Sequence, residues 1–432
     1  MEFITFLKEK LSVCLPEIIA EYEGEVQAAS LSAMERGLKA ALQEIGGEAL
    51  EYWLAAQTPK YPADEKRCPH CGAQAYYVRW REAKSSTVWG RVTYRRPYYE
   101  CATCHQGHCP LDEALGIKPG QMSAEVQQIA ALLGANTSFA RSSELLERIA
   151  QVKVSPNSIR KATQQMGARV MQQEAVQVAE SQDLEAQREH QRVPDKPRRL
   201  YGSLDGFMAH IEQDWHEMKA GTWWRVEADQ SAADITYYTD WQPAAEFSAL
   251  TWATGFQRLA DQSDEVIFVA DGADWIWRIV QEHFPHAIQI VDWYHAFSYV
   301  RAVAQAAFTD ETTRQTWLTQ QHTALWHGQR AQVFHACRAY ADVAPEPVTR
   351  ALTFFARQRA RMRYDRYRAA GYQIGSGTME SACKQLGQGR LKIAGAQWGE
   401  RGARLVAKAR AAFLSGQWDQ LTAVSRPLPY TA

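Results

Sequence analysis

The chain has 432 residues, enough for two to four domains, and its 46% hydrophobic and 22% charged residues are ordinary for a globular protein. Its formal net charge of −1 gives no overall attraction to a polyanion, so any contact with nucleic acid must come from local clusters of cations. The first residues lack the apolar core of a signal peptide, and no run reaches the ~18 apolar residues of a membrane span. We therefore expect a cytoplasmic protein without a membrane partner.

Residues 1–60 are predicted to form an N-terminal helical segment. Apolar residues recur there at helical spacing, and Gly46-Gly47 is expected to end the run. This apolar face consists of Leu31, Met34, Leu38, Ala41, Leu42 and Ile45.

Five of the eight cysteines lie between Cys68 and Cys109. Cys68-Pro-His-Cys71 and Cys101-Ala-Thr-Cys104 flank β-like segments, among them residues 76–78, 87–89 and 91–94. Two CxxC pairs across a small sheet are typical of a zinc ribbon, which we place at residues 61–115 with Zn²⁺ held by Cys68, Cys71, Cys101 and Cys104. Substitutes for one ligand are His70, His105, His108 and Cys109. Cys14, Cys337 and Cys383 are expected to be small buried apolar residues.

The predicted ribbon carries cations interleaved with aromatic residues, of which Arg91 and Arg95 are candidate DNA contacts, although a solvated β surface has the same composition. Residues 120–180 contain three helix signatures. Ser123 is expected to cap the first, which ends at Gly134, Ser143 is expected to cap the second, and Pro156 to start the third. The third helix has Arg160 and Lys161 on its outer face. Such an arrangement resembles a helix-turn-helix DNA-binding domain, or a small helical bundle. Residues 181–199 are predicted to be a linker.

An α/β pattern begins at residue 200. Strands are predicted at 200–208, interrupted at Asp205-Gly206, and at 223–228, 235–239, 266–270 and 288–291. Asp271 and Asp292 follow the last two strands, in the position where chemistry collects in α/β sheets. Helices are predicted from residue 294 to 368, ending in an arginine-rich run that includes Arg361 and Arg363. Beside an acidic site, a phosphate-binding role for this run is as reasonable as a solvated helix face.

Glu380 is expected in the first turn of a helix that follows Gly375-Ser-Gly-Thr-Met, with Lys384 and Arg390 further along. Asp205, Asp271 and Glu380 together have the chemistry of a site for two Mg²⁺ (or Mn²⁺) ions that catalyse in-line displacement at phosphorus. The alternative is that the two Asp-Gly pairs are ordinary turns and that Glu380 complements a helix dipole.

These motifs resemble the bacterial insertion-sequence transposases of the DDE class, closest to the ISKra group and related to mutator-type transposases. The resemblance rests on CPHC…CATC, SLDGF around Asp205, VADGADWIW around Asp271, DWYH at 292–295 and GSGTMESACK around Glu380. It implies a multidomain α+β protein with an RNase H-like core. The core would comprise residues 200–295 and 371–432, with an all-helical insertion at 296–370.

The resemblance implies that Asp205, Asp271 and Glu380 are the catalytic acids and that His295 belongs to the site. Asp292 is a further metal-ligand candidate and the alternative to Asp271 as the second acid. Expected partners are double-stranded DNA, as element ends and target, and a second copy of the chain in a homodimer or larger assembly. The expected function is cleavage and joining of DNA at terminal inverted repeats. The alternatives are a non-catalytic DNA-binding regulator and an RNase H-like nuclease.

Overall fold

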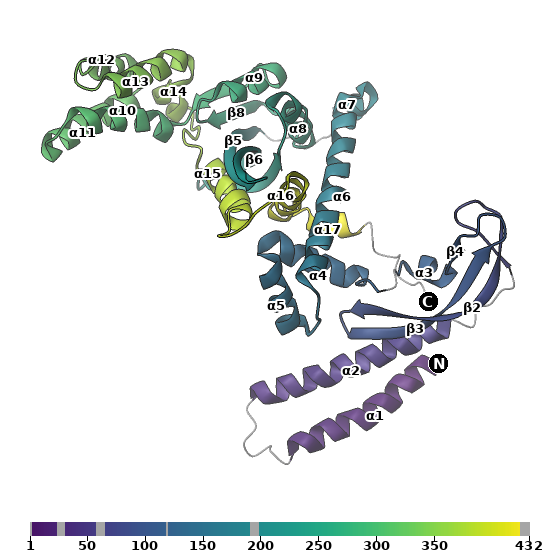
Figure 1. Ribbon diagram of the computed structural model, residues 1–432. Helices are drawn as coiled ribbons and strands as arrows, with labels where there is room; N and C mark the ends of the chain where they lie inside the picture. The colour runs from purple at the N-terminus through teal and green to yellow at the C-terminus, as the bar shows by residue number, and fades with distance from the viewer. Residues whose placement is uncertain (1, 24–30, 58–64, 118–119, 191–197, 424–432) are drawn as a thin grey trace. The chain divides into compact units, whose positions relative to one another are not determined.

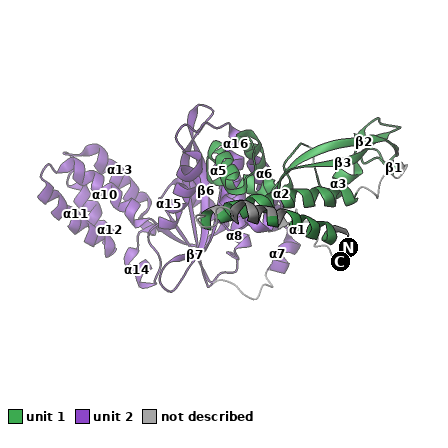
Figure 2. Ribbon diagram, turned by 90° about the horizontal axis from the view of Figure 1, so that it is seen from below, with its two compact units in different colours: residues 1–162, 427–432 green, residues 163–426 purple. Residues whose placement is uncertain are grey.

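The computed structural model describes residues 2–23, 31–57, 65–117, 120–190 and 198–423. They divide into two compact units, one up to Ala162 and one from Thr163 onward (Figure 2). Both contain helices and a sheet, so the expectation of a multidomain α+β protein is confirmed. Among these residues, no helix combines the length and the apolar character that crossing a bilayer requires.

The first unit begins with an antiparallel helix pair, α1 (Glu2–Glu23) and α2 (Leu31–Gln57). The Phe6 and Tyr52 rings stack at 4.3 Å, and Lys10 pairs with Glu48. The prediction that Gly46-Gly47 ends the second helix is wrong, because α2 continues to Gln57. Gly46 lies against the Trp89 ring, where a Cβ atom would come within 2.4 Å of a ring carbon, so the glycine serves close packing and not helix termination.

A four-stranded antiparallel sheet follows, in the order β1-β2-β3-β4 (Figure 1). Most of it is one long hairpin that turns at Val88-Trp89, so residues 87–89, predicted as a strand, form the end of β2 and the turn. Gly90 follows with a φ of 96°, which favours glycine. The bounds are β1 Glu65–Arg67, β2 Gln74–Thr87, β3 Gly90–Cys101 and β4 Gly107–His108, followed by α3 Pro110–Leu115.

Three helices come next: α4 (Ala124–Asn136), α5 (Phe139–Ala150) and α6 (Pro156–Gln182), the last of which enters the second unit. Ser123 caps α4 as predicted, but that helix runs past Gly134 to Asn136. The N-cap of α5 is Ser138 and not Ser143. Ser143 lies within the helix, and its hydroxyl donates to the Val154 carbonyl. Within the stretch expected to be a linker, residues 184–190 form helix α7.

The second unit is built on a five-stranded sheet in the order β7-β6-β5-β8-β9. The neighbours β5, β6 and β7 are antiparallel, whereas β8 and β9 run parallel to β5. The predicted interruption at Asp205-Gly206 is wrong, since β5 is continuous and Gly206 leaves room for the Glu217 side chain. The bounds are β5 Arg199–Ile211, β6 Asp214–Val226, β7 Ala232–Asp240, β8 Glu265–Ala270 and β9 Ile288–Val291.

Some helices lie around this sheet, and a further group lies to one side of it (Figure 1). One continuous apolar cluster runs from the sheet residues Trp223 and Phe268 to Phe355 and Tyr364 in the helical region. That region therefore shares a core with the sheet. The bounds are α8 Ala244–Gln257, α9 Asp274–His283, α10 Trp293–Ala307, α11 Glu311–Trp326, α12 Arg330–Arg338, α13 Pro345–Arg357, η2 Arg359–Arg361, α14 Tyr364–Ala369, α15 Gly377–Cys383, the π-helix η3 Lys384–Leu391, α16 Glu400–Leu414 and α17 Trp418–Ala423.

Candidate functional site

Asp205 lies on β5, and Asp271 directly follows the neighbouring parallel strand β8. Gly202 on β5 pairs with Phe268 on β8, and three residues further along each chain come Asp205 and Asp271. Asp205 is half-buried within β5, whereas Asp271 directly follows β8. The topology thus brings two acids that are far apart in the sequence to the same part of the sheet.

The environment of Asp205 disfavours its charged form. Burial and the negative charge of Asp271 raise the pKa of the Asp205 carboxyl to about 6, against the opposing hydrogen bonds from Gly206 and Cys383. The Gly206 N–H donates to Oδ1 at 2.7 Å, and the Cys383 thiol lies 3.6 Å from Oδ2. The charge of Asp271 therefore acts on the Asp205 carboxyl, so the two carboxylates lie near one another.

Asp271 also has a local structural role. Its Oδ1 accepts the Ala273 N–H at 2.9 Å, and Gly272 between them has a φ of 107°. Asp271 therefore closes the turn from β8 into α9, which is the ordinary role of an Asp-Gly pair. Within the described part of the chain, no group donates a hydrogen bond to its second carboxylate oxygen.

Glu380 lies in the first turn of α15, which packs against β5 and β6. Its carboxylate is exposed and 4.0 Å from the Lys384 ammonium. One turn later on the same helix, Cys383 contacts Asp205, so α15 brings Glu380 toward the two aspartates. Among the described residues, however, only the four ribbon cysteines form a group of three or more possible ligands within 4.8 Å of one another. The three carboxylates are gathered less tightly than that.

Asp292 is almost fully buried, at 1% exposure, and caps α10. Its Oδ1 accepts the His295 N–H at 2.6 Å, and its Oδ2 accepts both the backbone N–H and the hydroxyl of Ser376. Both oxygens are thus used within the protein. Asp292 connects the end of β9 to the residue that precedes α15, and this arrangement favours Asp271 over Asp292 as the second acid.

His295 and Asp271 line the same cavity of about 530 Å³. Its other wall comes from α13 in the helical region, including Arg350, Phe354 and Arg357. The His295 ring lies 5.5 Å from the Tyr299 ring and 5.7 Å from the Phe354 ring. The chain therefore places an imidazole, two guanidinium groups and an aromatic wall directly beside one of the acids.

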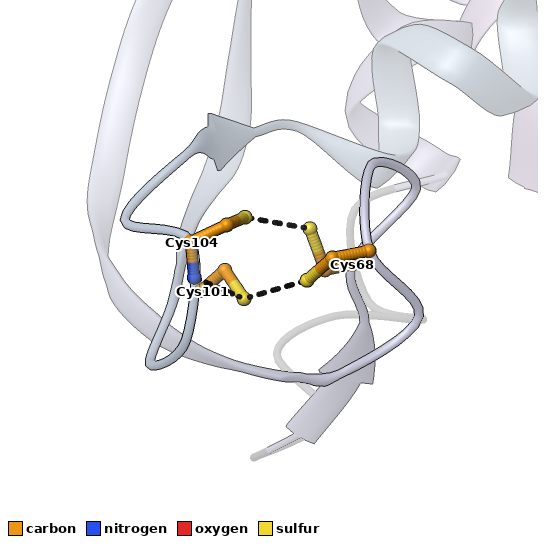
Figure 3. Close-up of side chains that lie close together, drawn as sticks. Cys68, Cys101 and Cys104 are labelled. Carbon is orange, nitrogen blue, oxygen red and sulfur yellow. Dashed lines mark hydrogen bonds between the residues drawn. The ribbon is translucent and has the colours of Figure 1, made fainter.

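The four ribbon cysteines converge at the open end of the hairpin, where Cys68 and Cys71 precede β2 and Cys101 and Cys104 lie at the end of β3 and just after it. Figure 3 shows three of them, Cys68, Cys101 and Cys104. Sγ–Sγ distances are 3.6 Å for Cys68–Cys104 and 3.5 Å for Cys71–Cys101, close to the ~3.8 Å edge of a tetrahedral shell with ~2.3 Å metal–sulfur bonds. N–H groups of Cys104 and Thr103 donate to the Cys101 sulfur and lower the pKa of that thiol to about 6. This set can bind a metal such as zinc.

The other proposed ribbon ligands are not part of this group. Cys109 is buried and lies 3.3 Å from a nitrogen of Arg96, which also pairs with Asp112. His108 is buried as well, and its ring lies 5.9 Å from the Tyr99 ring. These residues belong to the packing around the ribbon.

The candidate DNA contacts differ in accessibility. Arg91, Arg95, Lys161, Arg363 and Lys384 are exposed, and Arg160 is partly exposed with hydrogen bonds to Asn157.

Two of the candidate contacts are occupied within the protein. Arg361 is partly buried over the Trp277 ring and donates to Gln289 and Gln358. Arg390 is 2% exposed and lies over the Trp398 ring, so it does not present its charge to solvent.

Sequence reasoning overlooked two residues of this site. One is Cys383, which was expected to be only a buried apolar residue but contacts Asp205. Of the other two cysteines in that prediction, Cys337 is buried as predicted, and the side chain of Cys14 lies outside the described residues. The spacing of Cys383 from Glu380, one helical turn, was the available signal. Ser376 had no such signal, because its partner Asp292 is distant in the sequence.

A comparison with protein families finds a match to part of the chain. The model of a family described as "Uncharacterised protein family (UPF0236)" matches residues 26–208, which cover helix α2, the cysteine ribbon, helices α4 to α7 and most of the strand that carries Asp205. No curated protein matches the chain.

Proposed function

We propose that this protein is a metal-dependent DNA transposase of the DDE class, similar to the ISKra group, with Asp205, Asp271 and Glu380 as its acids. The observation that carries the proposal is the position of Asp205 on β5 beside the parallel strand β8, which Asp271 directly follows, together with the contact from Cys383 that brings the Glu380 helix to Asp205. These contacts would bring three carboxylates from distant parts of the chain to one region of the sheet.

The sheet supports an RNase H-like core. Its first three strands form an antiparallel meander, and the fourth and fifth lie on the other side of the first strand and parallel to it. This is the arrangement expected for an RNase H-like fold. Helices α10 to α14 occupy the sequence position of the expected insertion, between β9 and the Glu380 helix.

The donor set fits Mg²⁺ or Mn²⁺, because carboxylate oxygens are the ligands these cations prefer. Bound cations would supply Lewis acidity at the scissile phosphate and a more acidic attacking water or 3′-hydroxyl. The protein's part is to hold Asp205 and Asp271 side by side and to fix α15 through Asp292 and Ser376. His295 would contact the substrate phosphate from the cavity that it lines together with Asp271.

The first unit is proposed to bind the ends of the element. Zinc at the four cysteines would hold the hairpin, whose exposed Arg91 and Arg95 are suited to phosphate contacts. Helices α4 to α6 would act as a helix-turn-helix-like reader, with Lys161 on an exposed face. Because the reaction pairs two DNA ends, we propose a homodimer or larger assembly working on chromosomal DNA in the bacterial cytoplasm.

The test is incubation of the purified protein with Mg²⁺ or Mn²⁺ and labelled DNA that carries the flanking element ends. Metal-dependent nicking at the ends, followed by joined products, is the expected result. Nicking without joining would indicate the nuclease alternative. Binding of the ends without cleavage in either metal would indicate a regulator, in which Asp271 serves only the turn that its Ala273 hydrogen bond closes.

A further inference from the structure

Two neighbouring cavities form a groove that leads away from Asp271. The first, of about 530 Å³, contains Asp271 and His295 in its lining, and the second has a volume of about 500 Å³. Asp274, Arg357 and Gln358 line both, so the cavities are contiguous. The groove lies between the β8–α9 segment and helix α13, entirely within the second unit.

Arginine side chains line this groove along its length. Arg350 lines the first cavity, Arg357 lines both, and Arg278 lines the second. All three are exposed. The ion pair between Arg357 and Asp274 is 64% and 59% exposed on its two sides, so solvent screening leaves the guanidinium available to a competing phosphate.

An aromatic surface lies at the end of the groove nearest the acids. The Tyr299 and Phe354 rings stack at 4.2 Å with an interplanar angle of 18°, and both residues line the first cavity. A preformed ring pair beside exposed guanidinium groups is the combination that binds single-stranded nucleic acid, because unpaired bases stack on aromatic faces while arginines contact the phosphates. Bases within a duplex are already stacked on each other and cannot use such a surface.

We infer that this groove binds a single-stranded segment of the DNA strand whose phosphate reacts at the acids. This inference rests on the proposed function and names the state of its substrate. The nucleotide next to that phosphate occupies the first cavity with its base against the partly exposed Tyr299 ring, which the buried Phe354 ring supports from behind. The following phosphates contact Arg357 and Arg278, and each cavity has a volume in the range suited to one small ligand. An acidic peptide could pair with the arginines, but it would make no use of the aromatic wall and would be repelled by the adjacent Asp271.

The test uses the full-length protein in metal-free buffer, with a fluorescein-labelled mixed-sequence single strand and the blunt duplex of the same sequence. Fluorescence anisotropy is measured for the wild type, Arg357→Gln and Tyr299→Leu. The matched control is Arg338→Gln, an exposed arginine on α12 that lines neither cavity. We expect Tyr299→Leu to weaken single-strand binding at least ~5-fold. Arg357→Gln is expected to lower the slope of log affinity against log salt by roughly 0.7. Duplex binding and the control should be unchanged.

Location is tested by photocrosslinking a 5-bromodeoxyuridine single strand and identifying the labelled peptide by mass spectrometry. A crosslink to the peptide containing Tyr299 supports the groove, whereas crosslinks confined to the cysteine ribbon overturn it. Equal single-strand affinity in all variants also overturns the groove assignment. If the wild type nevertheless nicks element ends with Mg²⁺, the proposed transposase function is retained without the groove. If the groove substitutions weaken single-strand binding but the wild type never nicks DNA, the groove assignment is retained and the transposase proposal is rejected. Displacement of the single strand by poly-glutamate at equal charge concentration overturns the nucleic-acid assignment.

Discussion

The Asp292 carboxylate and Ser376 join the end of strand β9 to the start of helix α15 through two hydrogen bonds to one oxygen, from the serine N–H and its hydroxyl. The other carboxylate oxygen caps α10 through the His295 N–H. One buried side chain thus holds together the helix that begins the helical region and the helix that carries Glu380.

Replacing Asp292 with alanine is expected to lower the free energy of unfolding by about 2–3 kcal/mol, because a helix cap and two further bonds are lost in a buried position. Metal-dependent cleavage should fall, since α15 loses its anchor, while binding of DNA ends remains. The matched control is Asp310→Ala, which removes the exposed cap of α11 on Thr313. That variant should lose about 1 kcal/mol and cleave normally. Urea unfolding and a nicking assay measure both; equal cleavage by the two variants would contradict the anchoring role.

Asp271→Asn should abolish cleavage but keep the fold. The amide oxygen can still accept the Ala273 N–H, so the turn survives, whereas the negative charge that would hold a cation is lost. A loss of several kcal/mol of transition-state stabilisation corresponds to a rate lower by roughly a thousand-fold. Asp229→Asn, an exposed turn aspartate whose Oδ1 likewise accepts a backbone N–H, from Ser231, serves as control and should retain cleavage. Cleavage by Asp271→Asn at the wild-type rate would remove Asp271 from the site.

Proton competition should make cation binding at the acids depend on pH. The pKa of Asp205 is raised to about 6, so the carboxyl is largely protonated below that pH and charged above it. Only the charged form attracts a cation, and the affinity for Mg²⁺ should therefore fall as the pH decreases through about 6. Mn²⁺ titrations at several pH values, followed by electron paramagnetic resonance, measure this directly. Affinity that stays constant from pH 7.5 to 5 would show that Asp205 is not a ligand.

Cys101→Ser should release the metal of the ribbon and unfold it, because the cysteines take the place of a larger apolar core. Metal analysis by mass spectrometry should find one zinc per wild-type chain and much less in this variant. Cys109→Ser is the control, since Cys109 lies outside the four-sulfur group, and should retain its zinc. Equal zinc loss in both variants would place Cys109 among the ligands.

Lys408→Met should destabilise the second unit strongly. Lys408 is 1% exposed and pairs with Glu174 at 2.5 Å and Asp240 at 2.9 Å, linking α6, β7 and α16. Its removal leaves two largely buried acids with less compensation, at a cost of about 3–5 kcal/mol. Burial raises the pKa of Glu174, so part of this loss should be recovered at low pH, where Glu174 takes up a proton. Urea unfolding at pH 7 and pH 5 tests both statements, and a loss below 1 kcal/mol at pH 7 would contradict them.

The sequence by itself determined the elements and the chemistry that they carry. Apolar runs of strand length ended at Asp271 and Asp292, and CxxC spacing identified the four cysteines, because both signals depend on residues close together in the chain. It failed where distant packing outweighs a local rule: Gly46 accommodates Trp89 instead of ending a helix, and Gly206 accommodates Glu217 inside a strand.

Only the tertiary structure decided which acids have free oxygens and which are already bonded. Asp271 and Asp292 look alike in the sequence, since each follows a buried strand. Both carboxylate oxygens of Asp292 accept hydrogen bonds, one from His295 and one from Ser376. Asp271 instead lies near Asp205, and its negative charge raises the pKa of the Asp205 carboxyl. The reason is that strand register and the return of the chain at α15 place residues far apart in sequence within hydrogen-bonding distance. No local pattern records those contacts.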